Sequence, residues 1–235
     1  MAKRVLILAG GAAPIRSDLD AAWPGWDHGI ELVIAADAGA LLAGPLGLTL
    51  DLVVGDGDSL GEPALDELGR AGVAIERSPA DKDASDTELA LIAAAVRGAT
   101  DVVILGAFGG RLDHELANIW ILAHPALAGR TVALLDGRQR VRLLKAGNAV
   151  PGGLAAGLDL RSRVADLVTL LPFDGPATNV TTHGLRWALS GATLTIGYSL
   201  GLSNEVLRPA GEAARVELGG GRLIVIETSL LGSQP

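Results

Sequence analysis

Cysteine is absent from the 235 residues, and aromatic residues make up only 3% of the sequence. The chain therefore has no disulfide, no thiolate nucleophile and no thiolate metal ligand, and a cytoplasmic location is expected. Lys and Arg number 19 against 27 Asp and Glu, which gives a formal net charge of −8. Because no stripe of basic residues is present to neutralise phosphates, we expect no nucleic-acid partner.

Long apolar runs are also absent. The longest stretch without a charged residue, Trp187 to Asn204, is interrupted by Gly191, Gly197 and Gly201 and by several Ser and Thr residues. A membrane-spanning helix needs about 20 mainly apolar residues, so this stretch is interpreted as β structure and no membrane partner is expected. The sequence also lacks the Walker phosphate-loop motif and the Gly-x-Gly-x-x-Gly dinucleotide motif.

The hydrophobic pattern divides the sequence into two parts. Up to residue 136, short apolar runs alternate with Ala- and Leu-rich stretches, which is typical of an α/β fold with a parallel sheet. From residue 137 onward, short strands separated by close Gly, Pro, Asn and Asp turns predict an antiparallel β domain. The first part should contain strands at 5–9, 32–36, 52–55, 73–77, 102–105 and 132–135, and the second at 138–144, 167–171, 192–196, 214–218 and 223–227.

Two helices are expected in the first part. Ser85 and Glu88 form a capping-box pattern ahead of Leu89, and Gly98 ends that helix. A second helix should run from 113 to 124.

Acidic residues follow several of the predicted strands. Ligands of a parallel sheet bind beyond the carboxyl ends of its strands, so these side chains should meet at one edge. Such a group favours a divalent cation with oxygen ligands, either Mg²⁺ or Mn²⁺. Asp37 taken alone is interpreted as a turn residue. The acidic residues in question are Asp37, Asp56, Asp58, Asp81, Asp83, Asp86 and Asp113.

Glycine-rich turns follow the first and fifth predicted strands, at 9–12 and 106–110. Glycines let backbone N–H groups approach an oxyanion, which favours phosphate binding. Arg111 adds a guanidinium group beside the second turn, and His114 is interpreted as a general base, a helix cap or a nucleotide contact. In the second part, Trp187 lies among Gly and Ser residues and is either a core residue or a stacking surface. Trp23, Trp26 and Trp120 are interpreted as packing residues.

Taken in chain order, these motifs closely resemble the thiamine pyrophosphokinase family. The resemblance rests on Asp37-Ala38-Gly39, residues 55–59, 81–86, 106–114 and 184–187, and Ser203-Asn204. It implies a doubly wound, mostly parallel ATP-binding domain at 1–136 and a thiamine-binding β-sandwich domain at 137–235. It also implies Mg²⁺-dependent transfer of the pyrophosphoryl group of ATP to thiamine, by a homodimer with its active site at the subunit interface.

The resemblance also implies roles for individual residues. Asp83, Arg111 and Asp113 would be catalytic, and Asp56, Asp58, Asp81 and Asp83 would bind the metal ion. Thiamine would contact Trp187, Ser203 and Asn204. The residues that would bind ATP are Gly10, Gly11, Asp37, Gly39, Ser85, Asp86, Arg111, Asp113 and His114.

Two positions depart from the family pattern. Gly57 stands where the family often has Phe, and Ser85 stands where it often has Thr. Two other functions stay open at this point: a metal-dependent nucleotidyltransferase that releases pyrophosphate, and a non-catalytic sensor of thiamine or nucleotide. The first is suggested by the Leu-x-Gly-Gly pattern of residues 8–11 with Arg16.

Overall fold

A computed structural model describes residues 3–79, 83–147, 156–207 and 213–231. The chain divides into two compact units, Met1–Gly137 and Arg138–Pro235, which we call unit 1 and unit 2. Each unit is described by itself.

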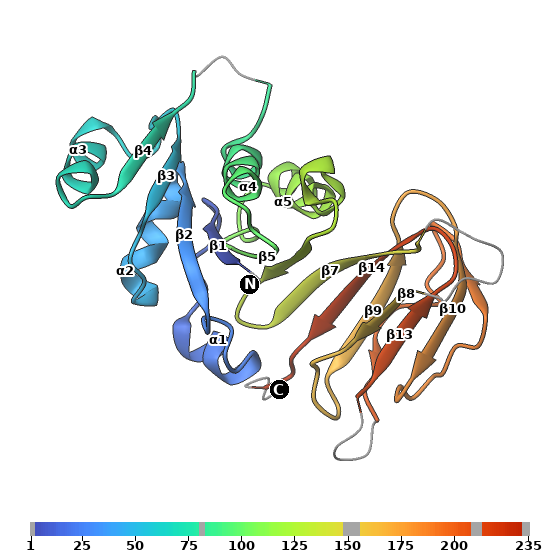
Figure 1. Cartoon of the computed structure of the whole chain (residues 1–235). Helices are drawn as coiled ribbons and strands as arrows, with labels where there is room; N and C mark the ends of the chain where they lie inside the picture. The colour runs from blue at the N-terminus through green and yellow to red at the C-terminus, as the bar shows by residue number, and fades with distance from the viewer. Residues whose placement is uncertain (1–2, 80–82, 148–155, 208–212, 232–235) are drawn as a thin grey trace. The chain divides into compact units, whose positions relative to one another are not determined.

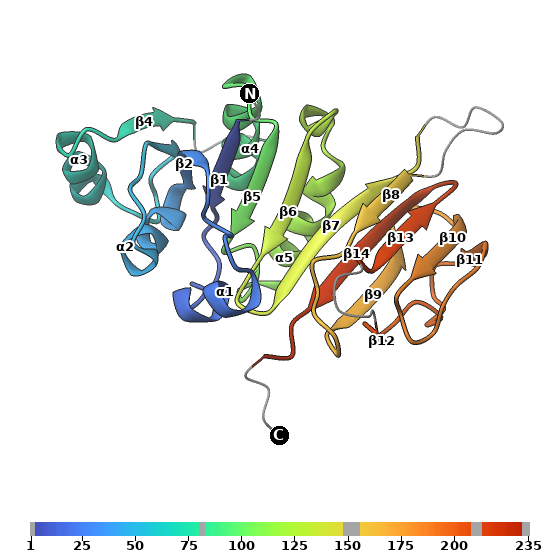
Figure 2. The same ribbon diagram turned by 60° about the horizontal axis from the view of Figure 1, so that its bottom comes forward.

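Unit 1 is built on a parallel sheet with the strand order β6-β5-β1-β2-β3-β4, of which Figure 1 labels β1 to β5 and Figure 2 labels β6 beside β5. Every pair of neighbouring strands in this order is parallel. The predicted α/β class with a parallel sheet is confirmed, and a strand lies at each of the six predicted places. The strands are β1 (Arg4–Leu8), β2 (Ile30–Ala36), β3 (Leu52–Gly55), β4 (Ala74–Arg77), β5 (Asp101–Leu105) and β6 (Thr131–Leu135).

Helices connect these strands. The α-helices are α1 (Arg16–Ala22), α2 (Ala43–Leu46), α3 (Glu62–Arg70), α4 (Asp86–Val96) and α5 (Leu112–Trp120). The 3-10 helices are η1 (Asp37–Leu42), η2 (Ile121–Ala123) and η3 (Pro125–Leu127). The predicted cap of α4 is confirmed, because the Ser85 hydroxyl accepts a 3.2 Å hydrogen bond from the Glu88 N–H. α4 packs against β1, β2 and β3, so its first turn lies near their carboxyl ends (Figure 1).

The core of unit 1 contains two of the three tryptophans predicted to pack there. Trp23 and Trp26 are buried among leucines of α1, α2 and the sheet. The prediction is wrong for Trp120, which is 55% exposed. Trp120 follows Leu112 and Leu116 at intervals of four on α5, and this apolar face of the helix stays exposed.

Unit 2 contains two antiparallel sheets, with the strand orders β12-β9-β14-β7 and β11-β10-β13-β8 (Figure 2). The predicted antiparallel β structure is therefore confirmed. Its strands are β7 (Gln139–Lys145), β8 (Ala156–Asp159), β9 (Leu167–Pro172), β10 (Ala177–His183), β11 (Ala192–Leu194), β12 (Asn204–Glu205), β13 (Arg215–Leu218) and β14 (Arg222–Thr228).

Apolar side chains from both sheets form one core in unit 2. Val168 and Val225 come from the first sheet, and Val180 and Val216 come from the second. The hydrophobic pattern of the sequence does not predict β8, β10 or β12. β12 has only two residues, and β10 carries polar residues between its buried ones, so neither gives a clear apolar run.

Among the described residues, no helix combines the length and the apolar character that crossing a membrane requires.

Candidate active site

A cavity of about 350 Å³ opens in unit 1 beyond the carboxyl ends of the parallel strands. Its walls come from the turns after β1, β2 and β5 and from the first turns of α4 and α5. This is the edge at which a parallel sheet binds its ligands. Of the predicted ATP-binding residues, those that line the cavity are Gly10, Gly11, Asp37, Ser85, Asp86, Arg111 and His114.

The two glycine turns form one wall of the cavity. The Gly11 N–H donates to the Gly106 carbonyl at 2.8 Å, and the Ala12 N–H donates to the Phe108 carbonyl at 2.7 Å. A Cβ atom added at Gly11 would lie 2.4 Å from both carbonyl oxygens. The turns therefore meet backbone to backbone, and only glycine fits at position 11.

Two side chains of α5 hold the second turn, and neither was singled out by the sequence analysis. The carboxylate of Glu115 accepts from the N–H groups of Gly109, at 2.8 Å, and Gly110, at 3.0 Å. The Asn118 amide donates to the Ala107 carbonyl at 2.8 Å. Glu115 and Asn118 are three residues apart and lie on the same face of the helix. That spacing is a signal that sequence reasoning could have used.

Three carboxylates gather beside the cavity. Ligand oxygens of Asp37, Asp56 and Asp58 all lie within 4.8 Å of one another. Asp37 is only 4% exposed, and its Oδ2 accepts from the Ser59 N–H at 3.1 Å. Its Oδ1 is buried and has no hydrogen-bond partner within the part of the chain that the structure describes. Asp37 is thus a buried member of the acidic group rather than an ordinary turn residue.

The acidic group has uneven electrostatics. Burial raises the pKa of Asp37 above its usual value. The Ser59 hydroxyl, which donates to Asp58 at 3.0 Å, lowers the pKa of that carboxyl. Three convergent carboxylates with one unsatisfied buried oxygen fit the oxygen-rich coordination of a hard divalent cation.

Two further residues, Asp81 and Asp83, are predicted metal ligands. Asp81 falls outside the described residues. Asp83 is exposed and belongs neither to the cavity lining nor to the group of Asp37, Asp56 and Asp58. Their assignment to a metal ion stays a prediction.

Arg111 and Asp113 form a two-pronged ion pair at the start of α5. Arg111 donates from Nε to Asp113 Oδ1 at 3.2 Å and from its terminal nitrogen to Oδ2 at 2.6 Å. The hydrogen bonds from Arg111 lower the pKa of Asp113. The side chains of Arg111 and Asp113 are 75% and 63% exposed, and only Arg111 lines the cavity. Asp113 therefore does not line the cavity itself, and it orients Arg111, which does.

Two glycines of the motifs serve packing. A Cβ atom at Gly39 would lie 1.9 Å from the Leu8 carbonyl oxygen, and Gly39 does not line the cavity. Gly39 therefore allows η1 to approach the end of β1. At Gly57, φ is +80°, and an added Cβ atom would lie 2.4 Å from Leu65 Cδ1. The buried Leu65 side chain thus fills the space beside this departure from the family pattern.

In unit 2, the three predicted thiamine residues have different environments. Trp187 is 59% exposed, and the Arg186 guanidinium lies 5.8 Å from the centre of its ring. Ser203 is exposed and has φ of +52°. Asn204 is buried and uses its amide internally: Oδ1 accepts from the Trp187 N–H at 3.0 Å, and Nδ2 donates to the Trp187 carbonyl at 2.7 Å. Asn204 therefore fixes the backbone that presents Trp187.

Comparison with known families gives matches in both units. The profile described as "Thiamin pyrophosphokinase, catalytic domain" matches residues 26–134. The profile described as "Thiamin pyrophosphokinase, vitamin B1 binding domain" matches residues 158–221.

Curated relatives agree with the family matches. The thiamine pyrophosphokinase of Bacillus subtilis is 27% identical over 209 residues, which cover 89% of this chain and 92% of the relative. Thiamine pyrophosphokinase 1 of Oryza sativa subsp. japonica is 27% identical over 162 residues. That match covers 66% of this chain and 59% of the plant protein.

Solved structures with the same fold cover nearly the whole chain. The crystal structure of thiamine pyrophosphokinase from Bacillus subtilis superposes with a TM-score of 0.79 at 24% identity, over 97% of this chain and 99% of that one. A thiamin pyrophosphokinase family protein from Enterococcus faecalis gives a TM-score of 0.76 at 27% identity, with the same coverage.

Proposed function

The chain belongs to the thiamine pyrophosphokinase family, and from this premise we propose that ATP binds in the cavity of unit 1 and thiamine binds beside Trp187 in unit 2. The reaction of the family transfers the pyrophosphoryl group of ATP to the hydroxyl group of thiamine, and it produces thiamine diphosphate and AMP. The observation that carries the proposal is the cavity itself, which combines glycine turns, a guanidinium group and an adjacent acidic group.

The phosphates of ATP would be held by Arg111, beside glycine turns that leave room for them. Gly10, Gly11 and Gly110 line the cavity without side chains that would keep an oxyanion away. Arg111 offers a planar fork that suits phosphate oxygens, and Asp113 keeps this fork in a fixed orientation. Ser85 and Asp86 line the cavity at the start of α4, and they complete the proposed nucleotide site.

We assign the binding of Mg²⁺ to Asp37, Asp56 and Asp58. Their oxygens converge, and the unsatisfied Oδ1 of Asp37 is suited to a cation. When bound, the ion would neutralise charge on the phosphates of ATP. Asp81 and Asp83 stay predicted members of the same region.

The chemistry requires an in-line approach of the thiamine hydroxyl oxygen to the β-phosphorus of ATP as AMP leaves. Transfer reactions of this kind depend mainly on positioning and on stabilisation of charge. In the proposal, Arg111 stabilises the negative charge that the phosphate oxygens carry during transfer. By analogy with arginine fingers, such a residue contributes roughly 10³-fold or more to the rate.

Thiamine would bind against the exposed face of Trp187. Its cationic thiazolium ring is attracted to the negative face of an indole, and its aromatic rings can stack on it. The exposed hydroxyl of Ser203 is the second proposed contact. Asn204 acts on thiamine through the Trp187 backbone that it holds.

The proposal extends to architecture and assembly. The core shared by the two sheets of unit 2 supports a β-sandwich, and the alternation of strands and helices in unit 1 supports a doubly wound sheet. We also propose a cytoplasmic homodimer with its active site at the subunit interface. Mixing Arg111→Ala with Trp187→Ala protein tests the last point, because heterodimers regain activity only where the two residues serve one site from different subunits.

Product analysis tests the proposed function directly. Purified protein is incubated with ATP, Mg²⁺ and thiamine, and AMP, ADP, pyrophosphate and thiamine diphosphate are separated. We expect AMP and thiamine diphosphate in equal amounts. Release of pyrophosphate would instead indicate a nucleotidyltransferase, and binding of thiamine with ATP left intact would indicate a sensor.

A further inference from the structure

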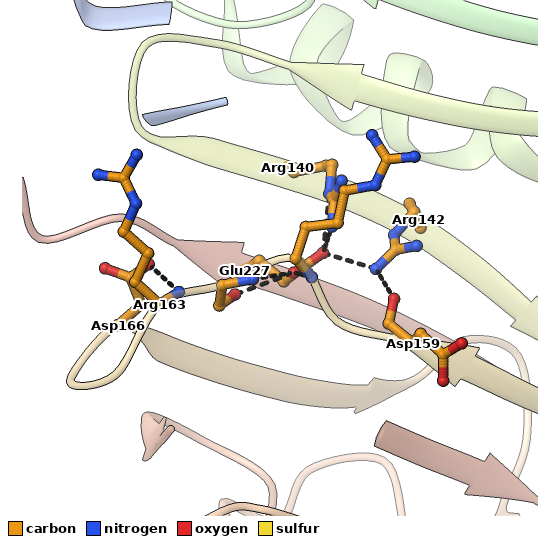
Figure 3. Close-up of polar contacts among 8 residues, drawn as sticks. Arg140, Arg142, Asp159, Arg163, Asp166 and Glu227 are labelled. Atoms are coloured by element: carbon orange, nitrogen blue, oxygen red, sulfur yellow. Dashed lines mark hydrogen bonds and ion pairs between the residues drawn. The ribbon is translucent and has the colours of Figure 1, made fainter. Parts of the chain in front are cut away.

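Unit 2 buries an ionisable residue that has no part in the proposed reaction. Glu227 of β14 is 0% exposed, and its carboxylate accepts six hydrogen bonds (Figure 3). Oε2 accepts from Arg140 at 2.8 and 2.5 Å and from Arg142 at 2.6 Å, both on β7. Oε1 accepts from the Arg161 N–H at 2.7 Å and from the N–H and hydroxyl of Ser162 at 3.0 and 2.9 Å.

Glu227 and Arg140 stay ionised at neutral pH. Burial alone would raise the pKa of Glu227, but Arg142 and Arg140 outweigh this effect and lower it. Burial lowers the pKa of Arg140 to about 10, so the guanidinium remains cationic. Because desolvation offsets much of the attraction within a buried ion pair, such a cluster adds less to stability than its contacts suggest. Its more distinctive effect is to fix the path of the segment that it binds.

That segment, residues 160–166, connects β8 to β9 and is fixed at both ends. Glu227 holds Arg161 and Ser162 at its start. Asp166, which is 5% exposed, closes its end. Asp166 Oδ2 accepts from the Arg163 N–H at 2.7 Å (Figure 3). Its Oδ1 accepts from the Leu230 N–H at 3.0 Å.

The end of this segment pairs with the chain beside Asn204. The Ala165 N–H donates to the Val206 carbonyl at 2.9 Å, and the Val206 N–H donates to the Asp166 carbonyl at 3.0 Å. Asn204, two residues before Val206, binds both the N–H and the carbonyl of Trp187. Hydrogen bonds and short backbone links therefore lead from the buried carboxylate to the exposed indole.

We propose that Glu227 is a positioning residue for thiamine, because it sets the path of residues 160–166 and, through Val206 and Asn204, the placement of Trp187. This inference rests on the proposed binding of thiamine at Trp187. Glu227 touches neither substrate in this proposal, so it should act on the affinity for thiamine and leave the affinity for ATP unchanged.

The test compares Glu227→Gln and the milder Ser162→Ala, which removes only one hydrogen bond to the carboxylate. We expect the KM for thiamine to rise about tenfold in Glu227→Gln and about threefold in Ser162→Ala, as hydrogen bonds to a charged group would suggest. The KM for ATP should stay within about twofold of the wild-type value. If Glu227→Gln fails to fold, Ser162→Ala carries the test.

Val225→Ala is the matched control for general loss of stability. Val225 is fully buried, and it lies two residues before Glu227 on the same face of β14. It makes no side-chain hydrogen bond to residues 160–166. If Val225→Ala raises the KM for thiamine as much as Glu227→Gln and Ser162→Ala do, the inference is overturned.

A spectroscopic readout separates this inference from the proposed function. The fluorescence of Trp187 is obtained as the difference between each protein and the same protein carrying Trp187→Phe. In both test variants, we expect a change in the emission of Trp187 or in its quenching by iodide. If neither variant changes the emission or the quenching, the inference is overturned. A fluorescence change with an unaltered KM for thiamine would instead overturn the proposed contact between Trp187 and thiamine.

Discussion

The carboxylate of Glu115 accepts a 2.8 Å hydrogen bond from the N–H of Gly109, on the turn that the proposed function assigns to phosphate binding. A negative side chain thus lies beside the place where a polyphosphate would bind. It shapes the turn through its acceptor oxygen, and it opposes an anion through its charge.

Removing the negative charge of Glu115 while keeping a side-chain oxygen as hydrogen-bond acceptor should strengthen ATP binding. We expect Glu115→Gln to lower the KM for ATP about two- to fivefold, since a screened like-charge interaction is worth about 0.5–1 kcal/mol. Initial rates at saturating thiamine measure this change. Glu67→Gln, on the exposed side of α3, is the control. A higher KM for ATP in Glu115→Gln would show that the charge itself is required.

The acidic group should be needed for turnover but not for folding. We expect Asp58→Asn to lower kcat about 100-fold or more, because Asp58 is a proposed ligand of the cation that neutralises the phosphates. Circular dichroism should show an unchanged fold, since Asp58 is exposed. Asp66→Asn, on α3 away from the cavity, should keep wild-type turnover. Equal rates in Asp58→Asn and wild type would exclude the proposed cation site.

The indole of Trp187 should contribute to thiamine binding alone. We expect Trp187→Ala to raise the KM for thiamine about tenfold, which corresponds to about 1.4 kcal/mol of stacking and cation–π attraction. Trp120→Ala removes another exposed tryptophan, in unit 1, and should leave this KM unchanged. Similar behaviour of the two variants would contradict the assignment.

A pair of glycines tests the packing at the end of β1. Gly39→Ala places a Cβ atom 1.9 Å from the Leu8 carbonyl, so we expect a loss of about 2 kcal/mol or more of unfolding free energy. A Cβ atom added at Gly44 of α2 would have no heavy atom within 4 Å. Gly44→Ala should therefore be neutral, or stabilising by up to about 1 kcal/mol. Urea denaturation measures both, and equal stability of the two variants would refute this account.

The contribution of Glu227 to stability should depend on pH. Its pKa is lowered on folding, so the stability that it contributes is present above the ordinary glutamate pKa of about 4.3 and is lost as the pH falls through the lower folded value. We expect Glu227→Gln to cost about 3–5 kcal/mol at pH 7 and clearly less at pH 3. Denaturant titrations at the two pH values measure this. A cost that does not change with pH would contradict the ionised state of Glu227.

The sequence predicts the strands of unit 1 well because each of them except β4 contains a short apolar run that ends at a polar or glycine residue. The carboxyl ends of parallel strands share one edge, so the meeting of Gly10, Asp56 and Arg111 around one region follows from the order of the strands. The sequence does not decide whether Trp187 is a core or a surface residue, because its exposure depends on tertiary packing that its neighbours in sequence do not reveal.

Contacts between distant segments explain what the sequence did not reveal. Asp37 joins the acidic group because its left-handed backbone, with φ of +40°, turns its carboxylate toward Ser59, 22 residues away. Glu227 bonds to residues 65 to 87 positions away, in strands and turns whose pairing is fixed only by the complete fold. Local sequence patterns do not reveal such distant hydrogen-bond partners.

Gly57 and Leu65 share a single fixed volume, since the leucine occupies the room that a side chain at position 57 would need. A side chain at position 57 therefore requires the Leu65 side chain to move or to be smaller. In a relative with a bulky residue at the position of Gly57, we expect a smaller residue at the position of Leu65 and a backbone outside the left-handed region. Introducing Phe at position 57 alone should fail in this chain, while the same change combined with a shortened residue 65 should be tolerated better. The residues at these two positions should therefore covary across the family.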